Sequence, residues 1–304
     1  MSVTSASSTT PGSAIPQHVL IVGGDGTIGS ALNKRLLAEG YQVTCSTRRP
    51  GVYGDTSLYL DLQDPDSFLT IKNRRFDAAV LCGAITSIQK CEENPEQTRQ
   101  VNVESTLALA DLLAESGSHP VFLSTNMVFD GSKPNAKSSD ARNPLTEYGR
   151  QKAAVEEALL AANRKAAIIR LGKVLPPSFP LFTGWLERLR SGNCIHPHAN
   201  RTIAPISLAF ATDILVWLIA EKRDGIFQAT ASYDITYADA AFTLAKLSQI
   251  DPSFIEPINA PLLQDSKGSH PPPFAYTALE FSPDLAPLFS QPPPDQALRY
   301  AIQQ

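Results

Sequence analysis

The chain has 304 residues, of which 43% are hydrophobic and 18% charged, a balance that is typical of globular proteins and excludes a largely disordered one. Its formal net charge is −4 and it has no run of basic residues, so we expect neither a nucleic-acid partner nor binding to a membrane. No apolar stretch is long enough to cross a bilayer. Four scattered cysteines without a C-x-x-C pair predict reduced thiols, no metal site and a cytoplasmic location.

We expect a short tail followed by two unequal parts. Residues 1–16 are rich in Ser, Thr, Ala and Pro and lack the positive start and apolar centre of a signal peptide, so they predict a disordered tail. Residues 17–175 predict a nucleotide-binding domain, and residues 176–304 a smaller substrate-binding lobe. A segment of about 204–230 is expected to return from the lobe to the first domain.

The first predicted unit is built around a glycine-rich turn. Val19–Val22 are typical of a strand buried on both faces, and the pattern G-x-x-G-x-x-G follows at once over residues 23–29. Helical spacing of apolar residues then continues to Gly40, and Tyr41–Cys45 predicts a second strand. Such a unit places a helix N-terminus against a pyrophosphate and predicts a doubly wound parallel α/β sheet of the Rossmann type. A Rossmann-like scaffold that binds no nucleotide stays the alternative, because glycine also serves purely structural turns.

The residues after the second strand bear on the choice of cofactor. Arg48 and Arg49 stand where dinucleotide-binding proteins often have an acid. An acid there accepts hydrogen bonds from the ribose 2′-OH of NAD, whereas arginine pairs with the 2′-phosphate of NADP. The two arginines therefore favour NADP over NAD, unless both are merely solvated.

The next elements are expected to bring further residues to the nucleotide. Strand 57–62 ends near Asp61, which either contacts adenine or caps the following helix. Strand 77–84 ends in small residues that allow a ribose or nicotinamide to lie against the backbone. Residues 95–116 predict one helix, with Asn102 as a polar position near its start.

A possible acid–base pair follows the fifth predicted strand, 120–125, which carries hydroxyls to its carboxyl end. Tyr148 and Lys152 are four apart on the next predicted helix and so share a face. A lysine ammonium stabilises phenolate and lowers the pKa of a phenol. Y-x-x-x-K alone is common by chance, but its position after a nucleotide-binding unit predicts that hydroxyl, phenol and ammonium meet at the carboxyl edge of the sheet.

The rest of the chain predicts further elements in order. We expect a mobile surface loop or lid at 132–143, a sixth strand at 166–175, an amphipathic helix at 182–190, a strand at 225–230, a helix at 237–249, and irregular connections at the proline clusters 271–273 and 292–294.

Three motifs together resemble the extended short-chain dehydrogenase/reductases. They are Gly-Gly-Asp-Gly-Thr-Ile-Gly at 23–29, Tyr-Gly-Arg-Gln-Lys at 148–152 and Ser-Thr-Asn-Met-Val-Phe-Asp-Gly at 124–131. The last run is similar to the Ser-Thr-Asp-Tyr-Val-Phe-Asp-Gly segment of dTDP-4-dehydrorhamnose reductases. The resemblance covers about residues 17–215.

The resemblance implies a role for each matching residue. Tyr148 would donate a proton to the substrate carbonyl, and Lys152 would lower the pKa of Tyr148 and bind the nicotinamide ribose. Thr125 would hold the carbonyl oxygen, and Asn102 is similar to an asparagine on the helix that holds the active-site water network. The residues expected at the cofactor are Gly23, Gly26, Thr27, Ile28 and Gly29 at the pyrophosphate, Asp61 and Leu62 at adenine, and Cys82, Gly83 and Ala84 along its length, besides Arg48 and Arg49.

The substrate pocket departs from the rhamnose-pathway pattern. Asn126 and Met127 replace its Asp-Tyr pair, which removes an aromatic hydroxyl, so the identity of the sugar nucleotide stays open. Arginine and lysine side chains further on could pair with a phosphate or carboxylate, or could equally be surface charges. The substrate contacts that we expect are Thr86, Asn126, Met127, Arg170, Lys173 and Arg201.

These expectations converge on an NADP-dependent enzyme that reduces a carbonyl on a sugar nucleotide or a related polar metabolite. An NAD-dependent sugar-nucleotide epimerase or dehydratase is one alternative. A non-catalytic NADP-binding regulatory subunit is another, because methionine adenosyltransferase regulatory subunits also resemble this group. The resemblance further implies a possible homodimer that pairs through the helices at 95–116 and 147–163.

Overall fold

The computed structural model describes residues 18–49, 54, 56–161, 165–260 and 274–303. The predicted tail at 1–16 and the proline cluster at 271–273 therefore lie outside the described residues. Within the described part of the chain, no helix is long and apolar enough to cross a membrane.

A seven-stranded parallel sheet forms the centre of the larger domain, in the order β10-β6-β5-β4-β1-β2-β3. The central strands β1, β4 and β6 are almost continuous apolar runs, as expected for a sheet covered on both faces, whereas β2 and β3 at one edge carry more polar residues. The direction of winding reverses between β1 and β4, and ligands bind at such switch points. This confirms the predicted Rossmann-type α/β fold. The strands are β1 (His18–Val22), β2 (Gln42–Thr47), β3 (Ser57–Tyr59), β4 (Ala78–Leu81), β5 (His119–Thr125), β6 (Ala167–Leu171) and β10 (Gly225–Ala229).

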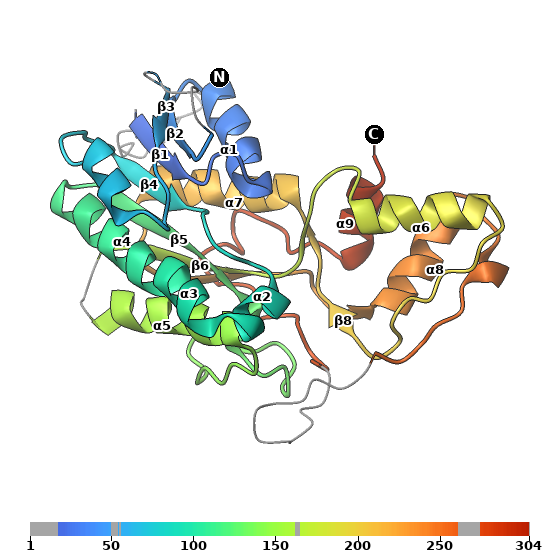
Figure 1. Cartoon of the computed structure of the whole chain (residues 1–304). Helices are drawn as coiled ribbons and strands as arrows, with labels where there is room; N and C mark the ends of the chain where they lie inside the picture. Colours follow the sequence, from blue (N-terminus) through green and yellow to red (C-terminus); the bar gives the residue numbers. More distant parts are fainter. Residues whose placement is uncertain (1–17, 50–53, 55, 162–164, 261–273, 304) are drawn as a thin grey trace, which may run out of the picture.

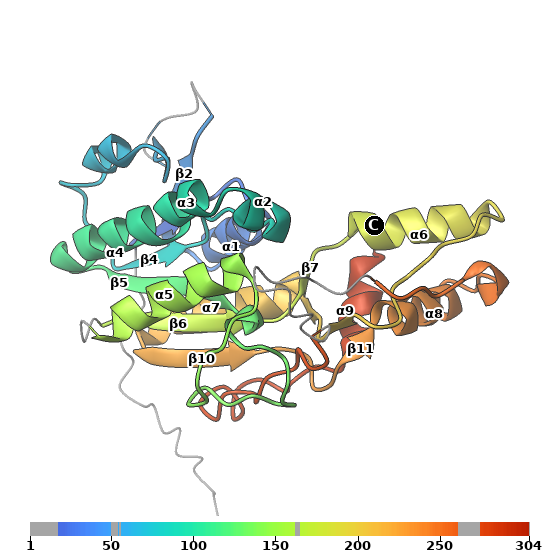
Figure 2. The ribbon, with the colours of Figure 1, turned by 60° about the horizontal axis from the view of Figure 1, so that its bottom comes forward.

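Helices cover the two faces of the sheet and bury a separate core on each. On one face, α1 (Thr27–Ala38) and α7 (Leu208–Glu221) pack against each other and the strands, with Leu36 and Leu215 fully buried. On the other, α4 (Thr106–Glu115) and α5 (Glu147–Ala161) cover the central strands, and Figures 1 and 2 show these two helices running side by side. The short helices on this side are α2 (Ile88–Glu93), α3 (Pro95–Arg99), η1 (Pro65–Thr70) and η3 (Asn126–Val128).

A smaller helical lobe extends from one end of the sheet (Figure 1). It contains α6 (Pro180–Arg190), α8 (Tyr237–Leu247) and α9 (Pro294–Ala301), which bury a core of their own around Phe182. Pro294 therefore begins a helix, where the sequence predicts an irregular connection. Short paired strands join the lobe to the sheet: β7 (Val174–Leu175) with β9 (Ile206–Ser207), and β8 (Thr202–Ile203) with β11 (Ile235–Thr236). The short helix η4 (Pro252–Phe254) follows α8 within the lobe.

Two predicted elements are interrupted. The helix expected at 95–116 consists of α3, a π-helical turn η2 (Gln100–Ser105) and α4. The strand expected at 166–175 splits into β6 and β7 at Gly172, where the chain passes from the sheet to the lobe. A Cβ on Gly172 would lie 2.5 Å from the carbonyl oxygen of Ala204, so the two backbones approach too closely for a side chain.

The C-terminal segment returns to the sheet in a way that the sequence does not indicate. Leu285 is fully buried in the core under α7, and Phe281 and Phe289 pack against the same core. Nearby, Ala136 of the loop 132–143 bridges to Leu279 and is buried. The centre of that loop is thus fastened to the edge of the sheet, and only its flanks fit the expected exposed lid.

A buried ion pair joins α5 to the same edge of the sheet. The Arg170 guanidinium on β6 lies 2.6 Å from a Glu156 carboxylate oxygen on α5, and the two side chains are 1% and 0% exposed. Ser124 donates a hydrogen bond to Glu156, and Arg170 donates another to Gln228 of β10. This corrects the expectation that Arg170 contacts substrate, because its guanidinium is fully engaged inside the protein.

Replacing Arg170 with Met would leave the Glu156 carboxylate buried without its main counter-ion. We expect the free energy of unfolding to fall by about 3–5 kcal/mol, measured by urea-induced unfolding. Arg142→Met is the matched control, because Arg142 lies 3.4 Å from the same carboxylate but is 25% exposed. This control should lower the free energy of unfolding by no more than about 1 kcal/mol. Equal losses in the two variants would contradict this account of the pair.

Candidate active site

The site begins with the glycine turn between β1 and α1. Gly23 has a φ of +82°, which favours glycine, and a Cβ there would lie 2.9 Å from the backbone nitrogen of Gly83 after β4. A Cβ on Gly29 would lie 2.3 Å from the Gly23 carbonyl oxygen, so α1 starts directly against the turn. Gly23 and Gly24 are half-buried whereas residues 25–27 are exposed, and the N–H groups of the first helical turn have no acceptor within the helix. This exposed cradle fits a pyrophosphate.

Neighbouring strands add the walls on either side of the turn. Ser46 on β2 accepts a hydrogen bond from the Gly23 N–H, which ties β2 to the loop, and Arg48 and Arg49 after β2 are exposed. Leu62 is buried against Gly83, so it packs beneath the turn after β4. The carboxylate of Asp61 accepts from the Gln63 N–H and closes a local turn.

The catalytic candidates come together at the carboxyl end of β5. Thr125 is the last residue of β5, and Tyr148 lies at the start of α5. The Lys152 ammonium nitrogen lies 5.9 Å from the centroid of the Tyr148 ring and 2.8 Å from the Leu123 carbonyl oxygen, to which it donates. The structure therefore places the predicted hydroxyl, phenol and ammonium at one edge of the sheet.

Burial decides the protonation of this pair. It raises the pKa of the Tyr148 phenol well above its usual value and lowers the pKa of Lys152 to about 8. Burial is the largest cause of the raised Tyr148 pKa, and the expectation that Lys152 lowers it stays a prediction. Burial likewise raises the pKa of the Cys82 thiol to about 12, so that side chain stays neutral beside Lys152.

A cavity of about 920 Å³ opens between this edge and the lobe. Its volume suits a small organic ligand. Thr125 and Tyr148 line it from the sheet, while Lys173 and Arg201 line it from the connections to the lobe. Of the predicted substrate contacts, the cavity brings together Thr86, Asn126, Met127, Lys173 and Arg201, and does not include Arg170.

Asn126 has a structural partner as well as a place in the cavity. Its side-chain amide donates to the Thr277 carbonyl oxygen at 3.0 Å, and Thr277 also lines the cavity. Asp234 accepts hydrogen bonds from the N–H and the hydroxyl of Thr277. The asparagine that departs from the rhamnose-pathway pattern therefore helps to hold the C-terminal wall of the cavity.

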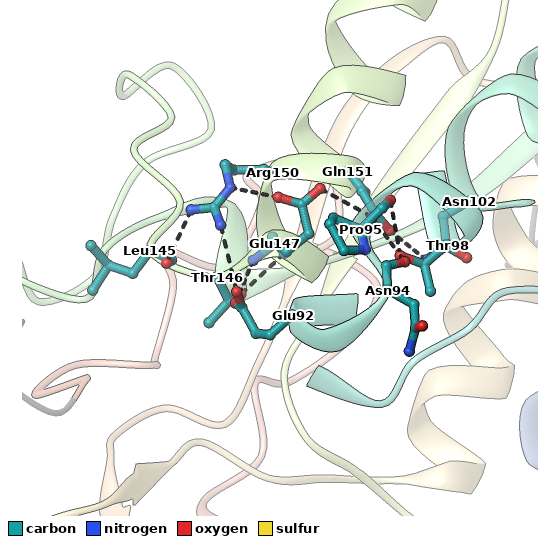
Figure 3. A network of polar contacts seen from close by, with 11 residues as sticks. Glu92, Asn94, Pro95, Thr98, Asn102, Leu145, Thr146, Glu147, Arg150 and Gln151 are labelled. Carbon is teal, nitrogen blue, oxygen red and sulfur yellow. Dashed lines mark hydrogen bonds and ion pairs between the residues drawn. The ribbon is translucent and has the colours of Figure 1, made fainter. Parts of the chain in front are cut away.

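Asn102 lies in the π-helical turn (Figure 3) and holds the loop after β4, in which Thr86 lines the cavity. Its side-chain oxygen accepts from the Ile85 N–H, and its amide donates to the Ile85 carbonyl oxygen and to Gln151. Its amide is thus engaged by protein groups and the residue is 1% exposed, while its expected link to a water network stays a prediction. The loop after β4 is fastened to α5 next to Lys152.

Two residues of this network were not predicted from the sequence. Gln151 joins Asn102 to Thr98 of α3, and Glu92 of α2 accepts the N–H of Glu147, the first residue of α5 (Figure 3). The Thr146 hydroxyl also accepts a hydrogen bond from the Gly149 N–H, as the side chain of an N-cap residue does. No local pattern marks Glu92, because its partner is 55 residues away.

The burial of Lys152 can be tested by measuring how the free energy of unfolding depends on pH. Its pKa in the folded chain, about 8, lies below the ordinary value of 10.5, so between these values the unfolded chain binds more protons and the free energy of unfolding rises with pH. Lys152→Met should lose this rise. Urea unfolding across the window should show the wild type gaining on the order of 3 kcal/mol relative to the variant. Parallel pH profiles would contradict a buried lysine at this position.

Comparison with known proteins agrees with this geometry. A family model described as RmlD substrate binding domain matches residues 17–266. A dTDP-4-dehydrorhamnose reductase of Mycobacterium tuberculosis is 30% identical over 252 residues, which cover 80% of this chain and 80% of that relative. A methionine adenosyltransferase 2 subunit beta of Bos taurus is 30% identical over 174 residues, but the match covers only 57% of this chain and 49% of that relative.

Solved structures share the fold over almost the whole chain. The dTDP-4-dehydrorhamnose reductase of Bacillus anthracis in complex with NADP has a TM-score of 0.80 and 17% identity, covering 93% of this chain and 97% of that one. A UDP-glucose 4-epimerase of Thermus thermophilus in complex with NAD has a TM-score of 0.74 and 19% identity, covering 93% and 98%. The chain belongs to the RmlD substrate binding domain family, and so to the enzymes of the extended short-chain dehydrogenase/reductase type.

Proposed function

We propose that the chain is an NADP-dependent reductase of a carbonyl group on a sugar nucleotide or a related polar metabolite. One observation carries the proposal. The side chains of Tyr148 and Thr125 both line a cavity at the carboxyl edge of the sheet, which is also the edge that carries the exposed glycine cradle. A proton donor, an oxyanion partner and a dinucleotide site would then serve a single ligand.

The protein residues would each perform one part of the reduction. NADPH, when bound, supplies a hydride to the carbonyl carbon. Tyr148 would donate its proton to the carbonyl oxygen, and its raised pKa keeps it protonated and able to do so. Thr125 directs its hydroxyl at the Asn126 side-chain oxygen over a long 3.3 Å, a contact that it can exchange for the substrate oxygen.

Lys152 would support the step after proton donation. Its ammonium is held by the Leu123 carbonyl oxygen and lies beside the Tyr148 ring, so its positive charge would stabilise the phenolate as it forms. Since its pKa is about 8, most of the lysine is charged at neutral pH. We expect the same side chain to bind the nicotinamide ribose.

Two cations on the lobe side of the cavity favour a substrate with an anionic group, whereas the carboxylates of Glu92 and Glu93 line the cavity on the side of α2. Lys173 and Arg201 both border it, and such side chains pair with phosphate or carboxylate oxygens. The Lys173 ammonium nitrogen also lies 5.3 Å from the ring of Phe179, which positions it at the lobe side. A diphosphate that links a sugar to a nucleoside would meet these cations while the sugar carbonyl faces Tyr148.

Tyr148→Phe tests the proton donor directly. NADPH consumption with dTDP-4-dehydrorhamnose and other nucleotide-linked ketosugars should fall by roughly 10²-fold, while the Kd for NADPH should change by less than about twofold. Tyr237→Phe is the matched control, because Tyr237 also lines the cavity, and it should retain most of the turnover. Unchanged turnover in Tyr148→Phe would contradict the assignment of Tyr148 as the proton donor.

The same assay separates the two other candidates. An NAD that copurifies with the wild type and is never consumed would favour an epimerase or dehydratase, a possibility raised by the structural likeness to an epimerase that holds NAD. Dinucleotide binding without substrate-dependent oxidation would favour a regulatory subunit, a possibility raised by the partial match to a methionine adenosyltransferase subunit.

A further inference from the structure

The carboxylate of Asp25 lies where the glycine turn meets the end of β2. Asp25 is the third residue of the turn that begins at Gly23, and its side chain is 43% exposed. One of its oxygens accepts a hydrogen bond of 2.6 Å from the hydroxyl of Thr47, the last residue of β2. The same oxygen lies 3.8 Å from the Arg49 guanidinium. A negative and a positive side chain therefore share the place between the turn and β2.

The Asp25 carboxylate is fixed by hydrogen bonds, whereas the Arg49 guanidinium is free to change its contacts. The Arg49 N–H donates to the Thr47 hydroxyl at 3.0 Å, and this hydroxyl in turn donates to Asp25, so a chain of hydrogen bonds fixes the carboxylate. The Arg49 side chain is 73% exposed and its contact with Asp25 is loose. Such exposed ion pairs contribute little to the free energy of folding. The guanidinium can leave Asp25 for a stronger anion, whereas the carboxylate stays in place.

This position matters because the end of β2 selects between the two nicotinamide dinucleotides. A carboxylate there accepts hydrogen bonds from the ribose 2′-OH of NAD, and an arginine pairs with the 2′-phosphate of NADP. Here the arginine comes from the residues after β2, as usual, but the carboxylate comes from the glycine turn. It would repel a 2′-phosphate and compete with it for Arg49, while it could accept from a 2′-OH.

We propose that Asp25 determines cofactor specificity in this chain by weakening the NADP preference that the arginines confer, so that the site also accepts NADH. The inference rests on the proposed function, because it assumes that a dinucleotide binds along the glycine turn. It assigns the ratio of the two affinities to one pair of opposed charges, Asp25 and Arg49.

The test is a titration of three variants and the wild type with NADPH and with NADH, following nicotinamide fluorescence. In Asp25→Asn, which keeps an acceptor for Thr47 but removes the charge, the ratio of Kd for NADH to Kd for NADPH should rise about tenfold. In Arg49→Ala the ratio should fall. Glu187→Gln, which removes an exposed carboxylate on α6 in the lobe, should leave it unchanged.

Salt concentration distinguishes an electrostatic role from a structural one. Repulsion between exposed charges is screened, so the effect of Asp25→Asn on the ratio should shrink as salt is raised, whereas a change in loop shape would persist. A ratio within about twofold of the wild type at low salt, or one that falls, would overturn the inference. Should the wild type bind neither dinucleotide, the proposed function and this inference would both fail; binding with an unchanged ratio overturns the inference alone.

Discussion

The close approach of two backbone turns at the carboxyl edge of the sheet is the constraint on which the rest of this structure depends. The turn after β1 and the turn after β4 meet at Gly23 and Gly83, where a Cβ would lie 2.9 Å from a backbone nitrogen. Gly29 then allows α1 to begin against the same turn. Because no side chain fits between them, backbone N–H groups and a helix N-terminus are left facing solvent, and this is the arrangement that binds a pyrophosphate.

Helix α5 connects this edge with the stability of the domain. Lys152 and Glu156 are one turn apart on it and both are buried, yet they serve different purposes. Glu156 is neutralised by Arg170 and ties the helix to β6, whereas the Lys152 ammonium donates to the Leu123 carbonyl oxygen and lies beside Tyr148. The ion pair between Glu156 and Arg170 holds α5 in place, and this offsets the free-energy cost of burying Lys152 on the same helix.

The sequence predicts best those features that depend on local spacing. The run Val19–Val22 with its glycine turn, and the four-residue spacing of Tyr148 and Lys152, each depend on the geometry of one or two elements and were found where expected. Features that depend on partners far away in the chain could not be predicted from the sequence. Arg170 and Lys173 are two cationic residues close together in the chain, and no sequence pattern distinguishes their environments. Arg170 forms a buried ion pair and Lys173 borders the cavity, a difference that arises from the packing between β6, α5 and the lobe.

The same limit explains the other differences. Nothing local marks the π-helical turn that orients Asn102, because its partners Ile85 and Gln151 come from other elements. Asp25 lies within a recognised motif, yet its contact with Thr47 becomes visible only when β2 is placed beside the turn. Asn102 and Asp25 are thus both held by long-range contacts, which no local sequence pattern shows.

A crystal structure of the chain with NADPH tests the central claim most directly. The account predicts density for the pyrophosphate along the turn from Gly23 to Gly29, with the nicotinamide end reaching toward Tyr148 and Lys152 and the cavity beside it left for substrate. Density for NADPH at another place, or none at saturating concentration, would contradict the assignment of this edge of the sheet as the active site.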